Sequence, residues 1–469
     1  MKIKKVLYGY GILLITNIIL FMLTVNNIIN YYLMIRIWTI SLIIGVIFII
    51  KSSNDLGDFI LSGYNIFLSI GVLFWSGQTI LFSLNISSIN ELEVFKWFNT
   101  QEVLKAQIYT TLFVYMFLLG KIIYSFSIKN IDDKYKKIDE KILMKSIFIV
   151  GIVMVAASIL PYYIGVLENI TLIQNNGYKA MYNIKDTSDI NNILGFIRNF
   201  YVPGLIICYF VSKNRKSKYD KIILSLVIIT VVLQFITGAR GGAISLLVAF
   251  IYINLYYDKK LNCKKILTIA CISLTIIIIS SIIAQTRVNI EENEVIYTNM
   301  NPVVEFIKES GGSQNPLIET MRIIPNYSYY RIGQSYLASI ISVIPSFLLF
   351  GHSFTQYAAL GQWLMKYLNM TYGPGYSIVA ECYYNFGYYG IIFAIFLGWC
   401  FAKIFYTKRR DNNLNIDVMF IAIILSFSIM STRNSIYLLI RNIVYLVIIP
   451  KFIINIIYKS NLKILRGRK

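Results

Sequence analysis

Long apolar runs separated by short polar segments dominate the sequence. A run of about 17 to 25 residues matches a membrane-spanning helix, because the hydrocarbon core is about 30 Å thick and a helix rises about 1.5 Å per residue. Twelve runs fit, so the pattern predicts an all-α polytopic integral membrane protein with about twelve transmembrane helices. They lie near residues 6–25, 33–50, 59–82, 107–127, 144–165, 193–212, 221–237, 242–257, 265–285, 377–405, 415–431 and 435–456.

Basic residues set the expected orientation of these helices. The first run follows Lys2, Lys4 and Lys5 and resembles a signal sequence, but it is longer than one and no small-residue cleavage site follows, so we expect it to remain as a helix. Short cytoplasmic loops are enriched in lysine and arginine. All basic clusters fall on one side when the N- and C-termini are both cytoplasmic. The clusters lie at residues 2–5, 129–145, 213–221, 259–265, 408–410 and 459–469.

A long segment between the ninth and tenth helices is then expected outside. It holds five of the eight prolines, and loops of this length are usually functional. Its apolar run at 336–350 is short and contains Pro345, so we expect an interfacial or re-entrant helix there; a full crossing would reverse the orientation of the later helices. The predicted organisation has helices 1–9 in residues 1–285, an external loop domain with short helices in 286–376, and helices 10–12 with a basic cytoplasmic tail in 377–469.

Composition agrees with a membrane protein. Hydrophobic residues make up 57% and charged residues 14%, against about 25% charged in soluble domains, with a mean hydropathy of +0.63. These values exclude disorder, a coiled coil and a cytosolic enzyme. A net charge of +21 would suggest nucleic acid in a soluble protein. In the predicted topology nearly all of it lies on lysines of the cytoplasmic surface, so we expect contact with membrane lipid and no nucleic acid.

The arginines are not concentrated on the cytoplasmic side as the lysines are. Arginine is suited to bidentate phosphate recognition, and boundary arginines usually line a cavity or pair internally. Any one of them could instead pair with a glutamate or with backbone carbonyls, but together they favour an external anionic site. Eight of them lie outside or at the outer ends of helices: Arg36, Arg198, Arg240, Arg287, Arg322, Arg331, Arg433 and Arg441.

Two short segments carry candidate chemistry. Thr237–Gly242 is a glycine-rich turn that could present backbone amides beside Arg240 to a phosphate, or could simply be a tight helical hairpin. Gly373-Pro374-Gly375 precedes a predicted helix whose spacing places Ser377, Glu381, Tyr384, Asn385 and Tyr388 on one face. Glu381 could neutralise an arginine or act as a general base, and both interpretations remain open.

Other candidates lie in the same part of the chain. His352, the single histidine, could accept a proton from a sugar hydroxyl or could be incidental. Aromatic residues could stack on sugar rings or form a membrane belt, with Trp363, Tyr376 and Tyr384, together with Asn385, as candidate sugar-binding residues. The five cysteines show no C-x-x-C pairing, and no P-loop, dinucleotide-binding or HExxH motif is present. We therefore expect no metal and no other cofactor.

The motifs Thr237–Gly242, Gly373-x-Gly375-x-Ser377-x-x-Ala380-Glu381 and Asn385-Phe386-Gly387, with the long external loop, resemble a bacterial O-antigen or capsular repeat-unit polymerase of the Wzy type. Arg322 to Gly333 also fits an Arg-x10-Gly pattern of some members. The resemblance implies a GT-C-like architecture in the bacterial cytoplasmic membrane with an outward-facing active site. It also implies a glycosyltransferase that joins polyprenyl-diphosphate-linked oligosaccharides, with a flippase and a chain-length regulator as candidate partners.

The implied chemistry needs a bound diphosphate and a base. Preorganised arginines can stabilise a diphosphate leaving group without a metal ion. A lipid-linked oligosaccharide flippase or transporter, and an O-antigen ligase, are the alternative functions. Glu381 is the first candidate base and His352 the second, and the residues assigned to diphosphate binding are Arg240, Arg287, Arg322, Arg331, Arg433 and Arg441.

Overall fold

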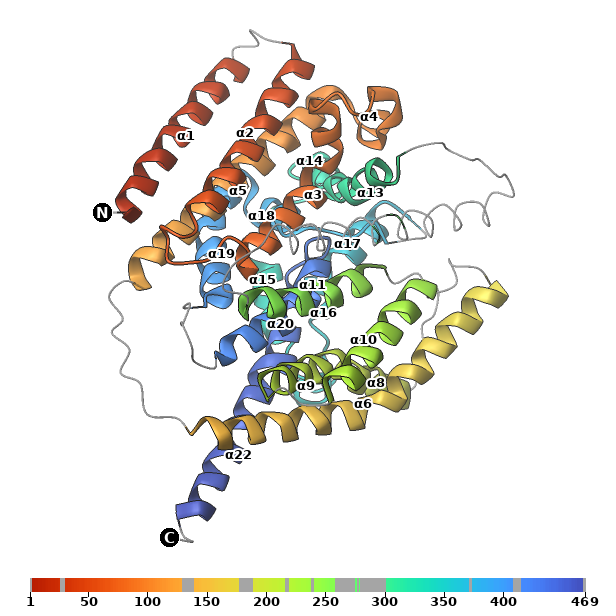
Figure 1. Cartoon of the computed structure of the whole chain (residues 1–469). Coiled ribbons are helices and arrows are strands. Elements are labelled where there is room, and N and C mark those ends of the chain that lie inside the picture. The colour runs from red at the N-terminus through yellow and green to blue at the C-terminus, as the bar shows by residue number, and fades with distance from the viewer. Residues whose placement is uncertain are drawn as a thin grey trace. The chain divides into compact units, whose positions relative to one another are not determined.

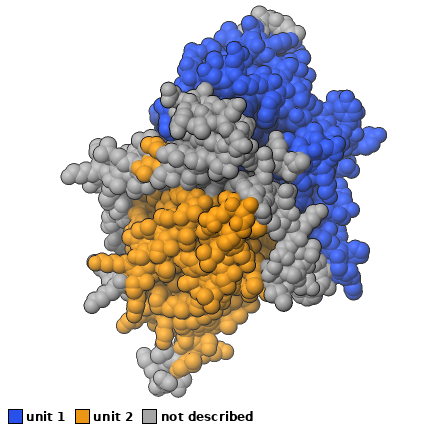
Figure 2. Space-filling model, turned by 90° about the vertical axis from the view of Figure 1, so that its right-hand side faces the viewer, with its two compact units in different colours: residues 1–133, 300–409, 431–440 blue, residues 134–299, 410–430, 441–469 orange. Residues whose placement is uncertain are grey.

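The computed structural model forms two compact units that do not follow the order of the chain (Figures 1 and 2). Unit 1 comprises Met1–Asp133, Met300–Arg409 and Ser431–Ile440, and unit 2 comprises Lys134–Asn299, Arg410–Met430 and Arg441–Lys469. The described residues are 2–25, 30–128, 139–176, 189–215, 219–237, 240–257, 275, 278, 301–370, 373–407 and 415–466.

Unit 1 begins with long apolar helices, of which α1, α2 and α5 lie side by side (Figure 1). Short helices α13 to α17 follow, and α18 and α19 then form one long apolar segment. The elements are α1 (Lys2–Val25), α2 (Tyr31–Ser52), α3 (Gly63–Ser83), η1 (Ile89–Glu91), α4 (Glu93–Trp97), α5 (Thr100–Ile128), α13 (Pro302–Gly311), η2 (Gly312–Gln314), α14 (Asn315–Ile323), α15 (Gln334–Ile341), η3 (Ser346–Leu349), α16 (Thr355–Ala358), α17 (Leu360–Tyr367), α18 (Ile378–Phe386), η4 (Gly387–Tyr389) and α19 (Gly390–Phe405).

Unit 2 is built mainly around α6, which packs against α9 and against the C-terminal helix α22. Close helix contact is possible because Gly151 and Gly204 carry no side chain; a Cβ at Gly151 would lie 2.8 Å from Ile207. Tyr162 of α6 and Tyr201 of α9 stack with ring centroids 4.4 Å apart. The elements are α6 (Glu140–Asn176), α8 (Asp189–Arg198), α9 (Tyr201–Arg215), α10 (Tyr219–Ile236), α11 (Arg240–Tyr257), α20 (Ile416–Ser431), η5 (Val444–Ile448) and α22 (Ile449–Arg466). Helix α21 (Tyr437–Ile443) begins in unit 1 and continues into unit 2 from Arg441.

The prediction of an all-helical membrane protein is confirmed for the described part of the chain. Nine helices there are long and apolar enough to cross a membrane, and each overlaps one of the predicted runs. Two further runs coincide with shorter apolar helices, Gly241–Tyr256 and Ile416–Ser431. The run near 265–285 lies, apart from two positions, outside the described residues.

The run at 336–350 contains less regular helix than its length suggested. Helix α15 ends at Ile341, the chain turns before Pro345, and a short 3-10 helix follows at Ser346–Leu349. Proline lacks a backbone N–H and disfavours helical geometry at the preceding residue, which accounts for the break.

Helices α5 and α19 approach closely through two glycines. A Cβ at Gly120 would collide with the carbonyl oxygen of Ile395, and one at Gly398 with the carbonyl oxygen of Phe117. Small residues at such positions let two helix backbones pack directly against each other. Because α19 continues from α18, this contact fixes the segment that carries Glu381 against α5.

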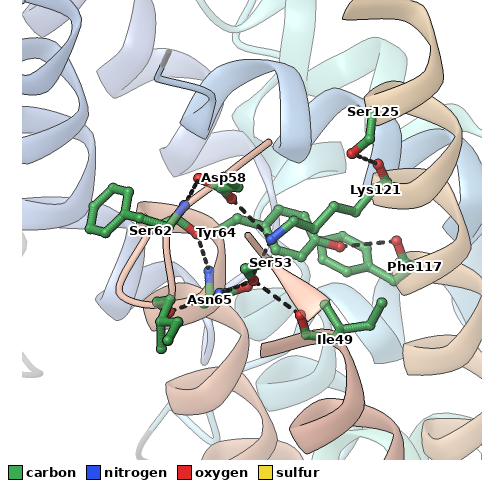
Figure 3. Close-up of polar contacts among 11 residues, drawn as sticks. Ile49, Ser53, Asp58, Ser62, Tyr64, Asn65, Phe117, Lys121 and Ser125 are labelled. Carbon is green, nitrogen blue, oxygen red and sulfur yellow. Dashed lines mark hydrogen bonds and ion pairs between the residues drawn. The ribbon is translucent and has the colours of Figure 1, made fainter. Parts of the chain in front are cut away.

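A buried polar cluster holds the turn between α2 and α3 (Figure 3). The Lys121 ammonium of α5 forms an ion pair with Asp58 at 3.0 Å, donates to the Asn65 side-chain oxygen at 2.8 Å and lies 4.7 Å from the Tyr64 ring centroid. The Asn65 amide in turn donates to the Ser53 hydroxyl at 2.7 Å. Lys121 is only 3% exposed, so its charge depends on these partners for compensation.

Candidate functional site

The start of α18 is shaped by the glycine and serine that precede it. Gly375 has a φ of +74°, which favours glycine, and a Cβ there would lie 3.1 Å from the Arg433 carbonyl oxygen. That carbonyl accepts a hydrogen bond from the Tyr376 N–H at 2.9 Å. Ser377 caps the helix, since its hydroxyl accepts from the Ala380 N–H at 3.1 Å. Glu381 therefore lies one turn after the start of a well-defined helix.

The Glu381 carboxylate is fully buried and joins three chain segments. One oxygen accepts from the Ser335 hydroxyl at the start of α15, at 2.7 Å, and the other from the Ile436 backbone N–H, also at 2.7 Å. The Asn385 amide donates to the Ser335 hydroxyl oxygen at 2.7 Å and to the Glu381 carbonyl at 2.9 Å. We call Glu381, Ser335, Asn385 and the Ile436 N–H the Glu381 network.

The segment that contains Ile436 is held on two other sides. The Trp75 indole of α3 donates to the Thr432 carbonyl at 2.8 Å. The Ser435 hydroxyl donates to the Ala358 carbonyl at 2.8 Å and accepts from the Leu360 N–H at 3.4 Å. Residues 431–436 are thus fixed in place between α3, α18 and the junction of α16 with α17.

Two of the predicted diphosphate ligands lie on segments that the Glu381 network joins. Arg331 is four residues before Ser335, and Arg433 is three residues before Ile436; both arginines are exposed. The Arg331 backbone N–H donates to the Tyr384 carbonyl at 3.3 Å. The Arg433 guanidinium lies beside Gly375, with Nε 3.8 Å from where a Cβ on that glycine would sit. Arg433 therefore lies beside the start of α18, and Arg331 lies beside its last turn.

The predicted sugar-binding aromatic residues form one group in the same place. The Trp363 ring of α17 is 4.7 Å from Tyr384 and 6.5 Å from Tyr376, measured between centroids, with edge-to-face geometry. The Tyr376 hydroxyl lies 2.9 Å from the Thr320 hydroxyl of α14, and burial raises the pKa of Tyr376, which keeps the phenol neutral. Tyr376 and Tyr384 are buried, whereas Trp363 is half-buried. Trp363 is thus the ring of this group with the most open face.

Arg322 is paired internally. Its guanidinium makes two short contacts with the Glu102 carboxylate, Nε to Oε1 at 2.6 Å and Nη2 to Oε2 at 2.7 Å, and lies 4.6 Å from the Phe98 ring centroid. A further contact reaches Glu319 at 3.5 Å. Hydrogen bonds to Glu102 raise the pKa of the Arg322 guanidinium, so it remains charged. The structure thus gives Arg322 the glutamate partner that the sequence left open for any single arginine.

The other predicted arginines belong to unit 2. The Arg441 guanidinium of α21 lies 5.9 Å from the Tyr445 ring centroid, one helical turn later. Arg240 begins α11, and its side chain, like all of Arg287, lies outside the described residues. A Cβ on the neighbouring Gly241 would collide with the Met430 sulfur. This close approach joins α11 to α20; residues 238 and 239 of the turn lie outside the described residues, and both interpretations of the turn stay predictions.

His352 lies away from these contacts. It is exposed in the turn between η3 and α16, where its backbone N–H donates to the Leu349 carbonyl at 3.0 Å. Its imidazole makes no hydrogen bond to another described residue. Within the described ranges, no three His, Cys, Asp or Glu side chains are grouped closely enough to hold a metal ion.

Sequence patterns missed three members of the site. Ser335 and the Ile436 N–H hold Glu381, and Thr320 holds Tyr376, yet each is far from its partner in the chain. Helical spacing did identify Glu381 and Asn385 as neighbours, because they are four residues apart on one helix. The only available signal for Ser335 was a small hydroxyl residue near the start of an uncharged run, which is too common to be specific.

Comparison with known proteins identifies a family. A family model described as O-antigen polysaccharide polymerase Wzy matches residues 9–463. This range contains the complete Glu381 network and all six arginines that the sequence assigned to the diphosphate. Searches of curated proteins and of solved structures found no match to the chain.

Proposed function

Since the chain belongs to the O-antigen polysaccharide polymerase Wzy family, we propose that it joins polyprenyl-diphosphate-linked oligosaccharide repeat units on the outer face of the cytoplasmic membrane. Family membership confirms the resemblance found in the sequence motifs. In general terms the protein is a multi-pass membrane protein and a repeat-unit polymerase, with lipid-linked oligosaccharides as its substrates and glycosyl transfer as its activity. The proposed arrangement is GT-C-like, with both termini cytoplasmic.

The proposed reaction is a displacement at an anomeric carbon. A hydroxyl oxygen of the acceptor repeat unit forms a bond to the anomeric carbon of the donor, and the bond from that carbon to the diphosphate oxygen breaks. The electron pair leaves with the polyprenyl diphosphate, and the hydroxyl proton passes to a base. Negative charge therefore grows on the diphosphate, where fixed cationic groups lower the energy of the transition state.

Arg331 and Arg433 are the proposed ligands of the donor diphosphate. The observation that carries this assignment is their placement: both are exposed, they lie at opposite ends of the nine-residue helix α18, and the segments that bear them are hydrogen-bonded to one buried carboxylate. Arginine presents a planar fork that matches phosphate oxygens, and fixing two of them in advance lowers the entropy lost on binding. Arg240, Arg287 and Arg441 remain proposed ligands on sequence grounds alone, and Arg322 is proposed to anchor α14.

Glu381 is proposed to position the two arginine-bearing segments. Its carboxylate is 0% exposed and both of its oxygens accept hydrogen bonds from the protein. A general base must instead reach the proton that it removes, directly or through one water. His352 is exposed and is the proposed base, since an exposed imidazole nitrogen can accept the proton of an acceptor hydroxyl directly.

Trp363 is proposed to stack on a sugar ring of the substrate. Its half-buried indole packs edge-to-face against Tyr376 and Tyr384. Tyr384 is buried, and Tyr376 and Asn385 already make hydrogen bonds within the protein, at 2.9 Å from Tyr376 to Thr320 and at 2.7 Å from Asn385 to Ser335. They are proposed to support the indole and the arginines, with no direct contact to sugar required.

The test uses purified protein in proteoliposomes supplied with a polyprenyl-diphosphate repeat unit. We expect a ladder of products without any other acceptor, and a rate of ladder formation about 10- to 100-fold lower in Arg331→Ala and in Arg433→Ala. Lys366→Ala, which removes an exposed cation of α17, is the matched control and should leave the ladder unchanged. Unaltered substrate carried across the membrane would support a flippase instead, and product formation only with an added lipid-core glycan would support a ligase.

A further inference from the structure

The segment after Arg331 has an unusual surface for a loop outside a membrane. Between Arg331 and Lys366 the sequence contains no Asp, Glu, Lys or Arg. Large apolar side chains are nevertheless exposed along it: Ile332 82%, Leu337 64%, Ile340 59%, Ile344 44%, Leu348 60% and Phe350 95%. Contiguous apolar surface of this kind marks contact with a partner or with a membrane.

Helix α15 separates its residues into two faces. Ser335, Ala338 and Ser339 are buried, and Ser335 makes the hydrogen bond to Glu381. Leu337 and Ile340 are exposed on the other side, and Ile344 and Leu348, in the turn and the 3-10 helix that follow α15, are exposed as well. We call Leu337, Ile340, Ile344 and Leu348 the α15 apolar face. The helix therefore contacts the candidate site with one side and presents hydrocarbon surface with the other.

The α15 apolar face adjoins the surface of a candidate membrane-spanning helix. Tyr336 of α15 packs on Phe393 of α19, with ring centroids 5.0 Å apart, and Phe393 packs on Phe396 at 5.5 Å. Phe396 is 55% exposed and Ile392 is 64% exposed, and both belong to the candidate span Ile378–Phe405. Residues of a span that are exposed in this way face lipid. The exposed apolar surface of α19 is thus continuous with that of α15, and Tyr336 lies between them.

We propose that the α15 apolar face lies in the hydrocarbon of the outer leaflet of the bilayer. Lipid is the occupant that fits, because the surface lacks charge and is continuous with a candidate spanning helix. An eight-residue helix is about 12 Å long, against about 30 Å for the hydrocarbon core, so α15 does not cross the membrane. It rests within one leaflet, and the break before Pro345 turns the chain back.

Lipid contact has a consequence for the diphosphate site, which rests on the proposed function. Arg331 lies three residues before the start of α15. With the α15 apolar face in hydrocarbon, the Arg331 guanidinium lies near the level of the lipid phosphates, where the diphosphate of a polyprenyl carrier also lies. Membrane insertion of α15 thereby sets the depth of one diphosphate ligand.

Spin labels at single introduced cysteines test the membrane contact in proteoliposomes. For each label we compare the ratio of its collisions with dissolved oxygen to its collisions with a water-soluble nickel chelate. This ratio should be at least about threefold higher for labels at Leu337→Cys and Ile340→Cys than for a label at Lys366→Cys, which replaces an exposed, charged residue of α17. Ile392→Cys on α19 is the lipid-facing reference, and the labelled parent protein gives the background from native cysteines. Preferential collision of the α15 labels with the nickel chelate would overturn the proposal, as would protection from both reagents, which indicates a protein partner.

Charge insertion tests the link to the site and keeps the two proposals apart. Leu337→Lys should reduce the rate of polymer formation at least about tenfold, whereas Lys366→Leu should leave it unchanged. An unchanged rate in Leu337→Lys would overturn the depth-setting role. The label at Leu337 could collide preferentially with oxygen while the parent protein forms no ladder. That result would support the membrane contact and would contradict only the proposed polymerase function.

Discussion

The Ser335 hydroxyl donates a hydrogen bond to the buried Glu381 carboxylate at 2.7 Å, across a separation of 46 residues. The second carboxylate oxygen accepts from the Ile436 N–H at the same distance. These two bonds connect the chain segments that bear Arg331 and Arg433. The geometry of two exposed cations therefore depends on a carboxylate that is itself closed to solvent.

Removing the Ser335 hydroxyl should disturb the site through Glu381. Ser335→Ala leaves one Glu381 oxygen and the Asn385 amide without their partner, which costs about 1 to 3 kcal/mol for a buried polar group. We expect a lower Tm and weaker binding of lipid-linked substrate. A double-mutant cycle with Glu381→Gln, scored by chemical denaturation, should give an interaction energy of about 0.5 to 3 kcal/mol. Simple additivity of the two changes would contradict coupling between these residues.

Arg331 and Arg433 should be sensitive to the shape of the cation as well as to its charge. Hydrogen bonds to charged groups contribute about 1.5 to 3 kcal/mol, so each alanine variant should lose about 10- to 100-fold in the rate of polymer formation. Lysine variants keep the charge but lack the planar fork and should recover only part of the rate. The rates are measured from product ladders over time, with Lys366→Ala as reference. Full activity of Arg331→Lys would contradict bidentate binding by that residue.

The Arg322–Glu102 pair should respond to exchange of its two charges. Either single change, Arg322→Ala or Glu102→Ala, should lower Tm modestly, because the side chains are 37% and 25% exposed and solvent weakens their attraction. The double variant Arg322→Glu with Glu102→Arg should restore both Tm and polymer formation. If Arg322 instead binds the diphosphate, the exchange will restore Tm and leave the protein inactive.

The Lys121–Asp58 pair should matter far more for stability than any exposed charge. Each group is less than a tenth exposed, so removing one leaves the other charge buried and uncompensated. We expect Lys121→Met or Asp58→Asn to reduce the free energy of unfolding by about 3 to 5 kcal/mol. Lys51→Met, at an exposed lysine of α2, is the control and should stay within about 0.5 kcal/mol. A change at Lys121 as small as that at Lys51 would show that the pair contributes nothing measurable.

Sequence patterns predicted the features that depend on local spacing. Apolar runs identified the long helices because the thickness of a bilayer fixes their length. The shared face of Glu381 and Asn385 follows from helical periodicity. Contacts between distant segments were not predictable: Arg322 pairs with Glu102, a residue 220 positions away, and Ser335 meets Glu381 only through the packing of α15 on α18. The sequence also could not show that Glu381 is closed to solvent, since burial depends on neighbouring segments.

The rate of polymer formation by Glu381→Gln tests the central claim most directly. Glutamine can accept from the Ile436 N–H with its oxygen and donate to the Ser335 hydroxyl oxygen with its amide, so the segments that bear Arg331 and Arg433 stay joined. Glu381→Ala breaks both links. A positioning role predicts that Glu381→Gln keeps the parent rate within about tenfold while Glu381→Ala loses the ladder. Loss of the ladder in Glu381→Gln, with Tm unchanged and substrate binding intact, would contradict positioning and identify Glu381 as the base.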